Sequence, residues 1–180
     1  MQKEAAVFIL FIKQDIPEII FTKRSIHLLE HSGEISFPGG LYEQRDKNLL
    51  ETALRETEEE IGIKRDVIKI IGSLSAEKSL KGKIVKPFVG VIEKDKDELE
   101  YTISQSEVDE LIFVPVNVFN ETNNFWSELW IRNKKLTKMY FYIYKSHIIW
   151  GMTGRIIFKL MKEKKSKLYR GLYAEHSKNI

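Results

Sequence analysis

The sequence lacks cysteine altogether, which excludes a disulfide framework and a thiolate metal site. The absence of cysteine fits a reducing compartment, so we expect a cytoplasmic protein. No apolar run approaches the ~20 residues that a membrane-spanning helix requires. The apolar segment at residues 5–12 is short, has no small-residue cleavage site and is followed by charged residues. It therefore indicates a strand rather than a signal peptide, and no membrane partner is expected.

A strong charge of either sign is also missing. The 29 lysines and arginines nearly balance the 26 aspartates and glutamates, leaving +3, so the composition does not indicate nucleic-acid binding. With 4 prolines and no visible repeat or linker, the 180 residues are predicted to form a single domain, 1–180. Only the tail at about 162–180 is distinctly basic. We expect a solvated helix there, and contact with RNA is the alternative.

Apolar and β-branched segments alternate with turn residues along most of the chain, which predicts an α/β (α+β) fold. Helices are predicted before Gly62 and from Ser146 onward. The aromatic residues within 120–133 recur at near-helical spacing, and Ser106 followed by Asp109 is typical of a helix start. Strands are predicted at Ala5–Ile12, Glu18–Thr22, Val67–Leu74, Ile84–Ile92, Leu111–Val118 and Lys138–Lys145.

The segment Phe37–Ile63 combines a glycine turn with an amphipathic helix. The two glycines after Pro38 tolerate positive φ, and Gly62 suits the left-handed position after a helix end. Asn48 followed by Glu51 predicts a capping arrangement at the helix start. At 100° per residue, one side of this helix forms a core stripe of Leu50, Ala53, Leu54, Thr57 and Ile61.

Three carboxylates crowd a second stripe of the same helix. Glu56, Glu59 and Glu60 fall within an arc of about 100°, and as i, i+3 and i+4 neighbours they repel one another. Arg55 offsets only part of this repulsion. A glutamate-rich helix face is most often a solvated surface. The adjoining glycine turn, arginine and core stripe favour instead a site for a hard cation, Mg²⁺ or Mn²⁺.

The segment Arg55–Ile63, RETEEEIGI, resembles the second half of the Nudix box. The first half departs from the general pattern, because Lys47 stands at the usual glutamate position and Leu41 at the usual leading glycine. The shifted spacing resembles that of the coenzyme A diphosphatase subfamily. At Leu29 the subfamily pattern has an arginine that is thought to help recognise coenzyme A. The subfamily's upstream signature is otherwise similar to Phe21, Thr22, Lys23, Arg24, Ser25, Gly33, Phe37, Pro38, Gly39 and Gly40.

The resemblance implies a Nudix fold, in which a mixed β-sheet is sandwiched between helices, and hydrolysis of a nucleoside diphosphate linked to another moiety. The implied cofactor is Mg²⁺ or Mn²⁺, held by Glu56, Glu59 and Glu60 and by the backbone carbonyl of Gly40 or its neighbour. Arg55 is expected to orient a glutamate rather than touch substrate. The expected partner is a small-molecule nucleotide, coenzyme A or a derivative, cleaved to 3′,5′-ADP and 4′-phosphopantetheine.

Further site residues are predicted on either side of the helix. Arg24, Lys23 and Ser25 follow a strand and are predicted phosphate contacts, with Gly39 alongside. Two adjacent cations in such a position are more often plain surface residues. In Nudix relatives an acidic residue of a late loop often supplies a further metal ligand or the general base.

Two glutamates near position 108 fit that late acidic role. Glu107 is preferred over Glu110, because the subfamily resembles this chain more closely there. An exposed capping segment is the competing interpretation for both. Other functions also stay open: hydrolysis of ADP-ribose or another nucleotide sugar or dinucleotide, and a regulator that binds nucleotide without hydrolysing it. A homodimer is left open as well.

Overall fold

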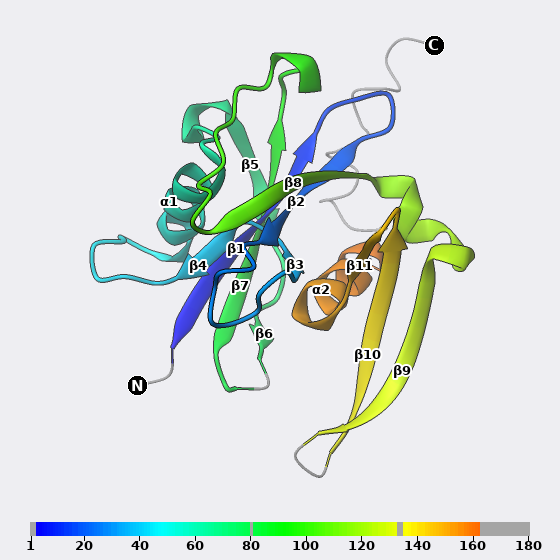
Figure 1. Ribbon diagram of the computed structural model, residues 1–180. Coiled ribbons are helices and arrows are strands. Elements are labelled where there is room, and N and C mark those ends of the chain that lie inside the picture. Colours follow the sequence, from blue (N-terminus) through cyan, green and yellow to red (C-terminus); the bar gives the residue numbers. More distant parts are fainter. Residues whose placement is uncertain (1–2, 80, 133–134, 163–180) are drawn as a thin grey trace.

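The computed structural model describes residues 3–79, 81–132 and 135–162, and it places a mixed β-sheet between two helices (Figure 1). Helix α1 (Leu49–Ile61) packs on one face of the sheet and α2 (Gly151–Lys162) on the other. The predicted α+β class with a sheet sandwiched between helices is confirmed. The strands of this sheet are β1 (Glu4–Ile12), β2 (Glu18–Arg24), β3 (Ile35–Ser36), β4 (Gly39–Leu41), β5 (Ile68–Ser73), β6 (Glu77–Lys78), β7 (Ile84–Ile92) and β8 (Val108–Pro115).

Strand β1 is the central strand of this sheet. It runs parallel to β7 along its whole length, and β7 in turn pairs antiparallel with β5 and β6. Two strands share the opposite edge of β1, since β2 pairs with Leu10–Ile12 and β4 with Ala5–Val7, both antiparallel. Strands β3 and β8 then pair with β2. As a result β2 and β4 diverge, and the opening between them is called the β2/β4 fork below.

The apolar run at residues 5–12 forms the predicted strand and is buried on both faces. Alternate side chains of a strand point to opposite faces of the sheet. Phe8 and Leu10 pack toward α1, whereas Ile9 and Phe11 pack toward α2. One strand therefore contributes to both halves of the core and fixes the two helix layers relative to each other.

Helix α1 begins and ends where its capping residues indicate. The Asn48 side chain accepts hydrogen bonds from the backbone N–H groups of Leu50 and Glu51, and Gly62 adopts φ 69° at the C-terminal end. The predicted core stripe is buried except for the half-buried Leu50. Glu51 does not complete a capping box, because its carboxylate pairs with Arg65 at 2.9 Å.

The helix start predicted at Ser106 is wrong. The backbone N–H groups of Glu107 and Val108 both donate to the Ser104 carbonyl at 2.9 Å, which closes a single turn, and β8 follows directly. Asp109 does not cap a helix either, since its carboxylate accepts a hydrogen bond from the Ile26 N–H at 3.1 Å. Pairing with β2 therefore overrides the local capping signal.

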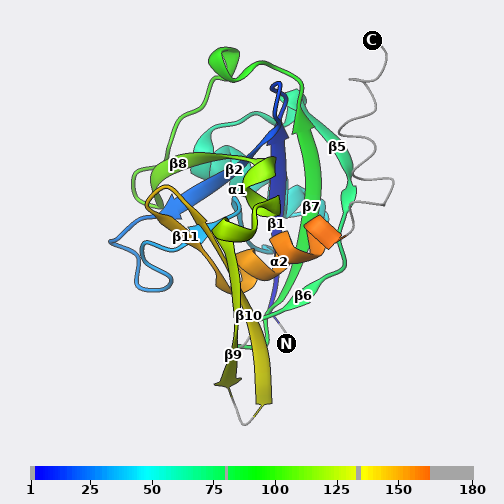
Figure 2. The ribbon, with the colours of Figure 1, turned by 90° about the vertical axis from the view of Figure 1, so that its right-hand side faces the viewer.

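The near-helical aromatic spacing within 120–133 also belongs to strands. β9 (Phe125–Arg132) and β10 (Lys135–Tyr144) form a long hairpin that projects from the rest of the molecule (Figure 2). Trp126 and Trp130, four residues apart, share one face of a strand just as they would share one face of a helix. Both indole N–H groups donate to Glu128. A short strand, β11 (His147–Ile149), occupies the start predicted for the last helix, which begins at Gly151 instead.

The described part of α2 reaches Lys162, whose ammonium lies 4.6 Å from the centroid of the Phe158 ring. Most of the basic tail predicted at about 162–180 lies outside the described residues. Among the helices of the described chain, none is long and apolar enough to cross a membrane.

We expect Asn48→Ala to lower the free energy of unfolding by about 1 kcal/mol, because a helix N-cap would be lost. The Asn48 carboxamide oxygen accepts from Leu50 N at 2.9 Å and from Glu51 N at 3.0 Å. Urea unfolding followed by circular dichroism measures the difference. Asn48→Asp keeps an acceptor in place and should match the wild type, so an alanine variant as stable as both would contradict the capping role.

Candidate metal and phosphate site

The β2/β4 fork is lined on one side by the backbone of β4. Gly39 adopts φ 146°, a region that favours glycine, and a Cβ there would lie 2.3 Å from the Ala6 carbonyl oxygen of β1. The absence of a side chain lets β4 pack directly on β1. The Gly39 N–H donates to Glu60 Oε2 at 3.0 Å. The strand backbone and the helix carboxylate therefore meet at the fork.

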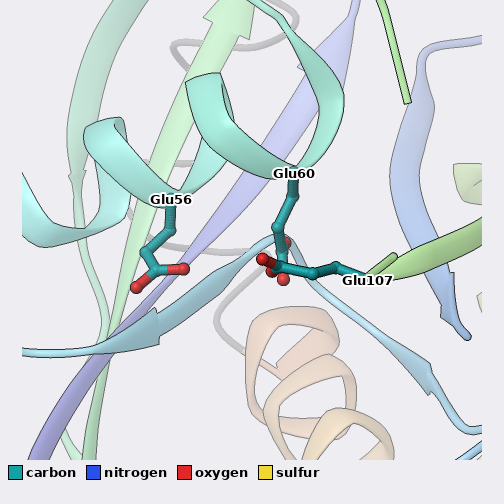
Figure 3. A group of neighbouring side chains, drawn as sticks. All are labelled: Glu56, Glu60 and Glu107. Atoms are coloured by element: carbon teal, nitrogen blue, oxygen red, sulfur yellow. The ribbon is translucent and has the colours of Figure 1, made fainter. Parts of the chain in front are cut away.

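Three carboxylates converge at this point (Figure 3). Glu56 and Glu60 extend from α1, and Glu107, the residue immediately before β8, points toward them. One oxygen from each lies within 4.8 Å of the other two. Like charges this close are unfavourable without a counter-ion, and a set of carboxylate oxygens is what a hard divalent cation prefers.

Glu60 is the most buried of the three carboxylates, with a side chain only 3% exposed. Burial, together with the charges of Glu56 and Glu107, raises the pKa of Glu60 to about 8. The Gly39 N–H and the Arg24 guanidinium, 3.8 Å away, act in the opposite direction. These two partners leave Glu60 short of compensating charge.

Glu56 stands directly against the backbone of Gly40. A Cβ at Gly40 would lie 2.3 Å from the Glu56 carboxyl carbon, so glycine leaves the room that this carboxylate occupies. Burial raises the pKa of Glu56, although the Arg55 guanidinium, 3.0 Å away, opposes that shift. Gly40, whose carbonyl is a predicted ligand, is therefore adjacent to the carboxylate cluster.

The position of Glu107 is set by hydrogen bonds to the last turn of α1. The final carbonyls of a helix have no partners within the helix. Here Thr102 N donates to the Ile61 carbonyl at 3.0 Å, and Ser104 N donates to the Glu60 carbonyl at 2.9 Å. A Cβ at Gly62 would lie 2.7 Å from Thr102 N, so this close approach requires glycine. The loop carrying Glu107 is thereby attached to the backbone of Glu60 itself.

Two further acidic residues that the sequence suggested for the site, Glu59 and Glu110, lie outside this cluster. Glu59 is exposed, and its carboxylate is held by Arg55 Nη1 at 2.7 Å and by Arg45 Nη2 at 3.0 Å. Glu110 lies 3.5 Å from His147 Nε2. The structure thus brings Glu107, rather than Glu59, together with the other two helix carboxylates; metal binding by Glu59 stays a prediction.

The predicted phosphate contacts occupy the other side of the fork. An irregularity in the pairing of β2 with β8 falls between Lys23 and Arg24. The Arg24 side chain is 27% exposed and lies beside Glu60, which places a cation at the carboxylate cluster. Ser25 is fully buried, and its N–H donates to the Glu107 carbonyl at 2.9 Å. Lys23 is half-buried opposite Glu110 on β8.

Asp46 was not predicted from the sequence, yet it is part of the charge network behind the cluster. Its carboxylate accepts from Arg55 Nε at 2.8 Å and from Arg55 Nη2 at 3.1 Å. The sequence carries a signal for it. Asp46 immediately precedes Lys47, which stands at the glutamate position of the general Nudix box, so a shift of one residue supplies the acid.

Comparison with known proteins identifies the family of this chain. Residues 2–134 match the NUDIX domain, so the chain belongs to the Nudix family. A curated relative, the uncharacterized Nudix hydrolase NudL of Photorhabdus laumondii subsp. laumondii, is 32% identical over 161 residues, which cover 89% of this chain and 84% of the relative. The chain is therefore a hydrolase of the Nudix family.

Solved structures show the same fold. The Caenorhabditis elegans Ap4A hydrolase binary complex superposes with a TM-score of 0.52 at 20% identity, covering 64% of this chain and 81% of that one. The NUDIX domain of Shewanella oneidensis NrtR, complexed with ADP ribose, gives a TM-score of 0.51 at 19% identity, covering 65% and 75%. At these identities the likeness concerns the fold alone.

Nudix hydrolases generally use divalent metal ions, and the residues at the fork fit such an ion. The potential ligands are all oxygen atoms, which suits Mg²⁺ or Mn²⁺. The carboxylate of Glu60 is almost fully buried, with one guanidinium 3.8 Å away as its nearest compensating charge. A divalent ion would remove the repulsion among the three carboxylates.

We expect the metal-depleted protein to lose stability as the pH rises from about 5 to about 8. In the folded state the pKa of Glu60 is about 8, whereas the pKa of a glutamate in the unfolded chain is about 4.3. In this window the folded state binds more protons, so its stability falls by at most about 1.4 kcal/mol per pH unit.

Urea unfolding in EDTA at several pH values measures this effect. Glu60→Gln carries no titrating group at that position, so its stability should depend less on pH and should exceed that of the wild type near pH 8. The difference between the two pH profiles of stability reports the titration of Glu60, because the other titrating residues are the same in both proteins. Parallel pH profiles for the two would show that Glu60 ionises normally.

We expect Gly40→Ala to weaken Mn²⁺ binding at least about tenfold while the protein stays folded. The new methyl group would overlap the Glu56 carboxylate, which is the flexible end of a side chain and can move aside. Electron paramagnetic resonance of Mn²⁺ measures the affinity, and urea unfolding checks the fold. An unchanged affinity would mean that the position of Glu56 against β4 is unimportant for the ion.

Proposed function

We propose that this Nudix hydrolase cleaves the diphosphate linkage of a nucleoside diphosphate joined to another moiety, with Mg²⁺ or Mn²⁺ as cofactor. The observation that supports this most is the convergence of Glu56, Glu60 and Glu107 beside the guanidinium of Arg24. Carboxylates alone would repel an anionic diphosphate. Cations are therefore needed for the diphosphate to bind beside the carboxylates, and the guanidinium of Arg24 supplies one of them.

Each residue has a separate task in the proposed reaction. Glu56, Glu59 and Glu60, with the Gly40 carbonyl, would hold the ion, which when bound polarises a phosphoryl group and acidifies a water. Glu107, less buried than Glu60, would accept the proton of the attacking water as general base.

The phosphate contacts complete the proposed mechanism. The planar guanidinium of Arg24 would bind phosphate oxygens, with Lys23 next to it as a second cation. Ser25 and Gly39 contribute through the backbone, because their N–H groups donate to the Glu107 carbonyl and to the Glu60 carboxylate. These two hydrogen bonds would keep Glu107, the proposed general base, and Glu60, a proposed metal ligand, close to a bound diphosphate.

Coenzyme A or a derivative is the proposed substrate, giving 3′,5′-ADP and 4′-phosphopantetheine. The shifted front half of the box and the upstream residues from Phe21 to Gly40 support this choice. Leu29 opposes it, since this fully exposed residue replaces an arginine of the subfamily pattern. Because leucine cannot make a charge-assisted contact with an additional phosphate, ADP-ribose or another nucleotide sugar or dinucleotide is the alternative substrate.

A panel of substrates tests the proposal directly. Purified protein with Mg²⁺ or Mn²⁺ is incubated with coenzyme A, ADP-ribose, NADH, diadenosine polyphosphates and nucleoside triphosphates, and products are separated by chromatography. We expect coenzyme A to be cleaved and EDTA to stop turnover. Cleavage of ADP-ribose with coenzyme A untouched would establish the alternative. Tight binding without turnover would instead favour a nucleotide-binding regulator.

Variants of α1 provide the matched comparison. Glu59→Gln combined with Glu60→Gln should lower kcat/KM by about a hundredfold or more, because ligand carboxylates would be lost. Glu58→Gln is the control on the same helix, since Glu58 pairs with Arg65 at 3.1 Å outside the cluster. Turnover that survives the double substitution would remove the metal-site assignment.

A further inference from the structure

The hairpin of β9 and β10 exposes a cluster of aliphatic side chains that the proposed function does not use. Antiparallel sheets commonly place apolar side chains toward the core and polar side chains toward water. In the part of the hairpin that extends past α2 (Figure 2), Leu129, Ile131 and Leu136 are instead 67%, 77% and 70% exposed. These three residues are called the aliphatic cluster below.

The aliphatic cluster lies on one face of the hairpin. Ile131 pairs with Leu136 across the two strands, and Leu129 shares their face because it lies two residues before Ile131. Phe125 belongs to the same face nearer the body of the molecule, where its ring stacks on Phe158 of α2 with the centroids 6.1 Å apart. Helix α2 therefore covers this face near Phe125, and the aliphatic cluster beyond it is exposed to solvent.

The opposite face of the hairpin is aromatic and carries one acid. The Trp126 ring stacks on Phe141 with the centroids 5.0 Å apart, and the Trp130 ring lies 5.8 Å from Phe141. Glu128 accepts hydrogen bonds from the indole N–H groups of Trp130 and Trp126 at 2.6 and 3.0 Å, which lower the pKa of its carboxyl group. An ionised carboxylate is costly to bring into hydrocarbon, so this surface suits a protein partner better than a lipid bilayer.

Strand β9 offers an edge to such a partner. Among the described strands it pairs with β10 and ends the order β11–β10–β9, so its outer backbone groups can pair with a further strand. A two-fold axis through Trp130 would place Leu129 of each copy opposite Ile131 of the other, in an antiparallel pair. The same axis would place Glu128 opposite Arg132, whereas an axis through Glu128 would bring two like charges together.

We propose that this chain forms a homodimer in which the β9 edges of two copies pair antiparallel about Trp130. The sheets would join into one sheet with three strands from each copy, and the aliphatic clusters would cover each other. A second copy is favoured over another protein because the edge is complementary to itself in this register: apolar residues meet apolar residues, and acid meets base. The inference is independent of the proposed hydrolysis, since the hairpin carries no proposed metal or phosphate ligand.

The first test is the mass of the full chain in solution, measured by light scattering and sedimentation equilibrium. We expect twice the mass of one chain at micromolar concentration. Leu129→Lys combined with Ile131→Lys would set ammonium groups opposite one another, and it should raise the dissociation constant of the dimer about a hundredfold or more. Ile70→Lys is the matched control, because Ile70 is an exposed isoleucine on the edge strand β5, and it should leave the dimer unchanged.

The absence of cysteine allows a second test, which addresses the register. Leu129→Cys in one copy would face Ile131→Cys in the other within reach of a disulfide, whereas two copies of the same variant would hold their thiols diagonally apart. Under mild oxidation, a mixture of the two variants should therefore give about fivefold more cross-linked dimer, or better, than either variant alone.

Several results would overturn the inference. A monomeric wild type would do so, and so would a dimer that the lysine substitutions leave unchanged or that Ile70→Lys weakens equally. Equal cross-linking by Leu129→Cys alone would contradict the register about Trp130. Circular dichroism checks the fold, and if the lysine variant does not fold, a mixture of cysteine variants that fails to cross-link decides against the dimer. A monomer that binds vesicles of phosphatidylcholine and phosphatidylglycerol would assign the hairpin to a lipid surface instead.

Discussion

The burial of the Glu60 carboxylate beside two other carboxylates is the constraint on which the rest of the site depends. A charge removed from water must be compensated by neighbours, or it is lost by protonation. The surrounding elements supply only part of that compensation: a backbone N–H from Gly39 and the guanidinium of Arg24. Glu107 adds repulsion instead. Its loop is hydrogen-bonded to the Glu60 carbonyl, which brings the Glu107 carboxylate close to that of Glu60. The chain thus places a concentrated negative charge where a cation would bind most strongly.

Charges of alternating sign extend outward from that point. Behind the helix glutamates lies Arg55, and behind Arg55 lies Asp46, which is itself held by Thr52 and by the backbone of Glu43. Each layer is oriented by the next, as in the outer coordination shells of metal sites in general. Glu59, held between two arginines, lies at the exposed margin of this arrangement.

Local signals in the sequence predicted the helix and its ends well, because Asn48, Gly62 and the core stripe act within a few residues of chain. Local signals could not place Glu107 beside Glu56 and Glu60, since its loop is bound to the end of α1 by backbone hydrogen bonds between distant segments. Glu107 was a candidate only because of the family resemblance. The helix wheel alone also could not separate Glu59 from its neighbours, because Arg45 comes from another part of the chain. For Trp126 and Trp130 the spacing was ambiguous, because four residues return to the same face of a helix or a strand.

The divided edge of β1 has a consequence for how such an enzyme can change over time. The two walls of the fork, β2 and β4, are each hydrogen-bonded to a different part of one central strand. The connection that leaves β2, residues 26–34, lies outside that paired framework. Such connections tolerate insertion and replacement better than the elements they join. Substrate preference can therefore diverge by exchange of connecting segments while the machinery for breaking the phosphorus–oxygen bond is inherited intact.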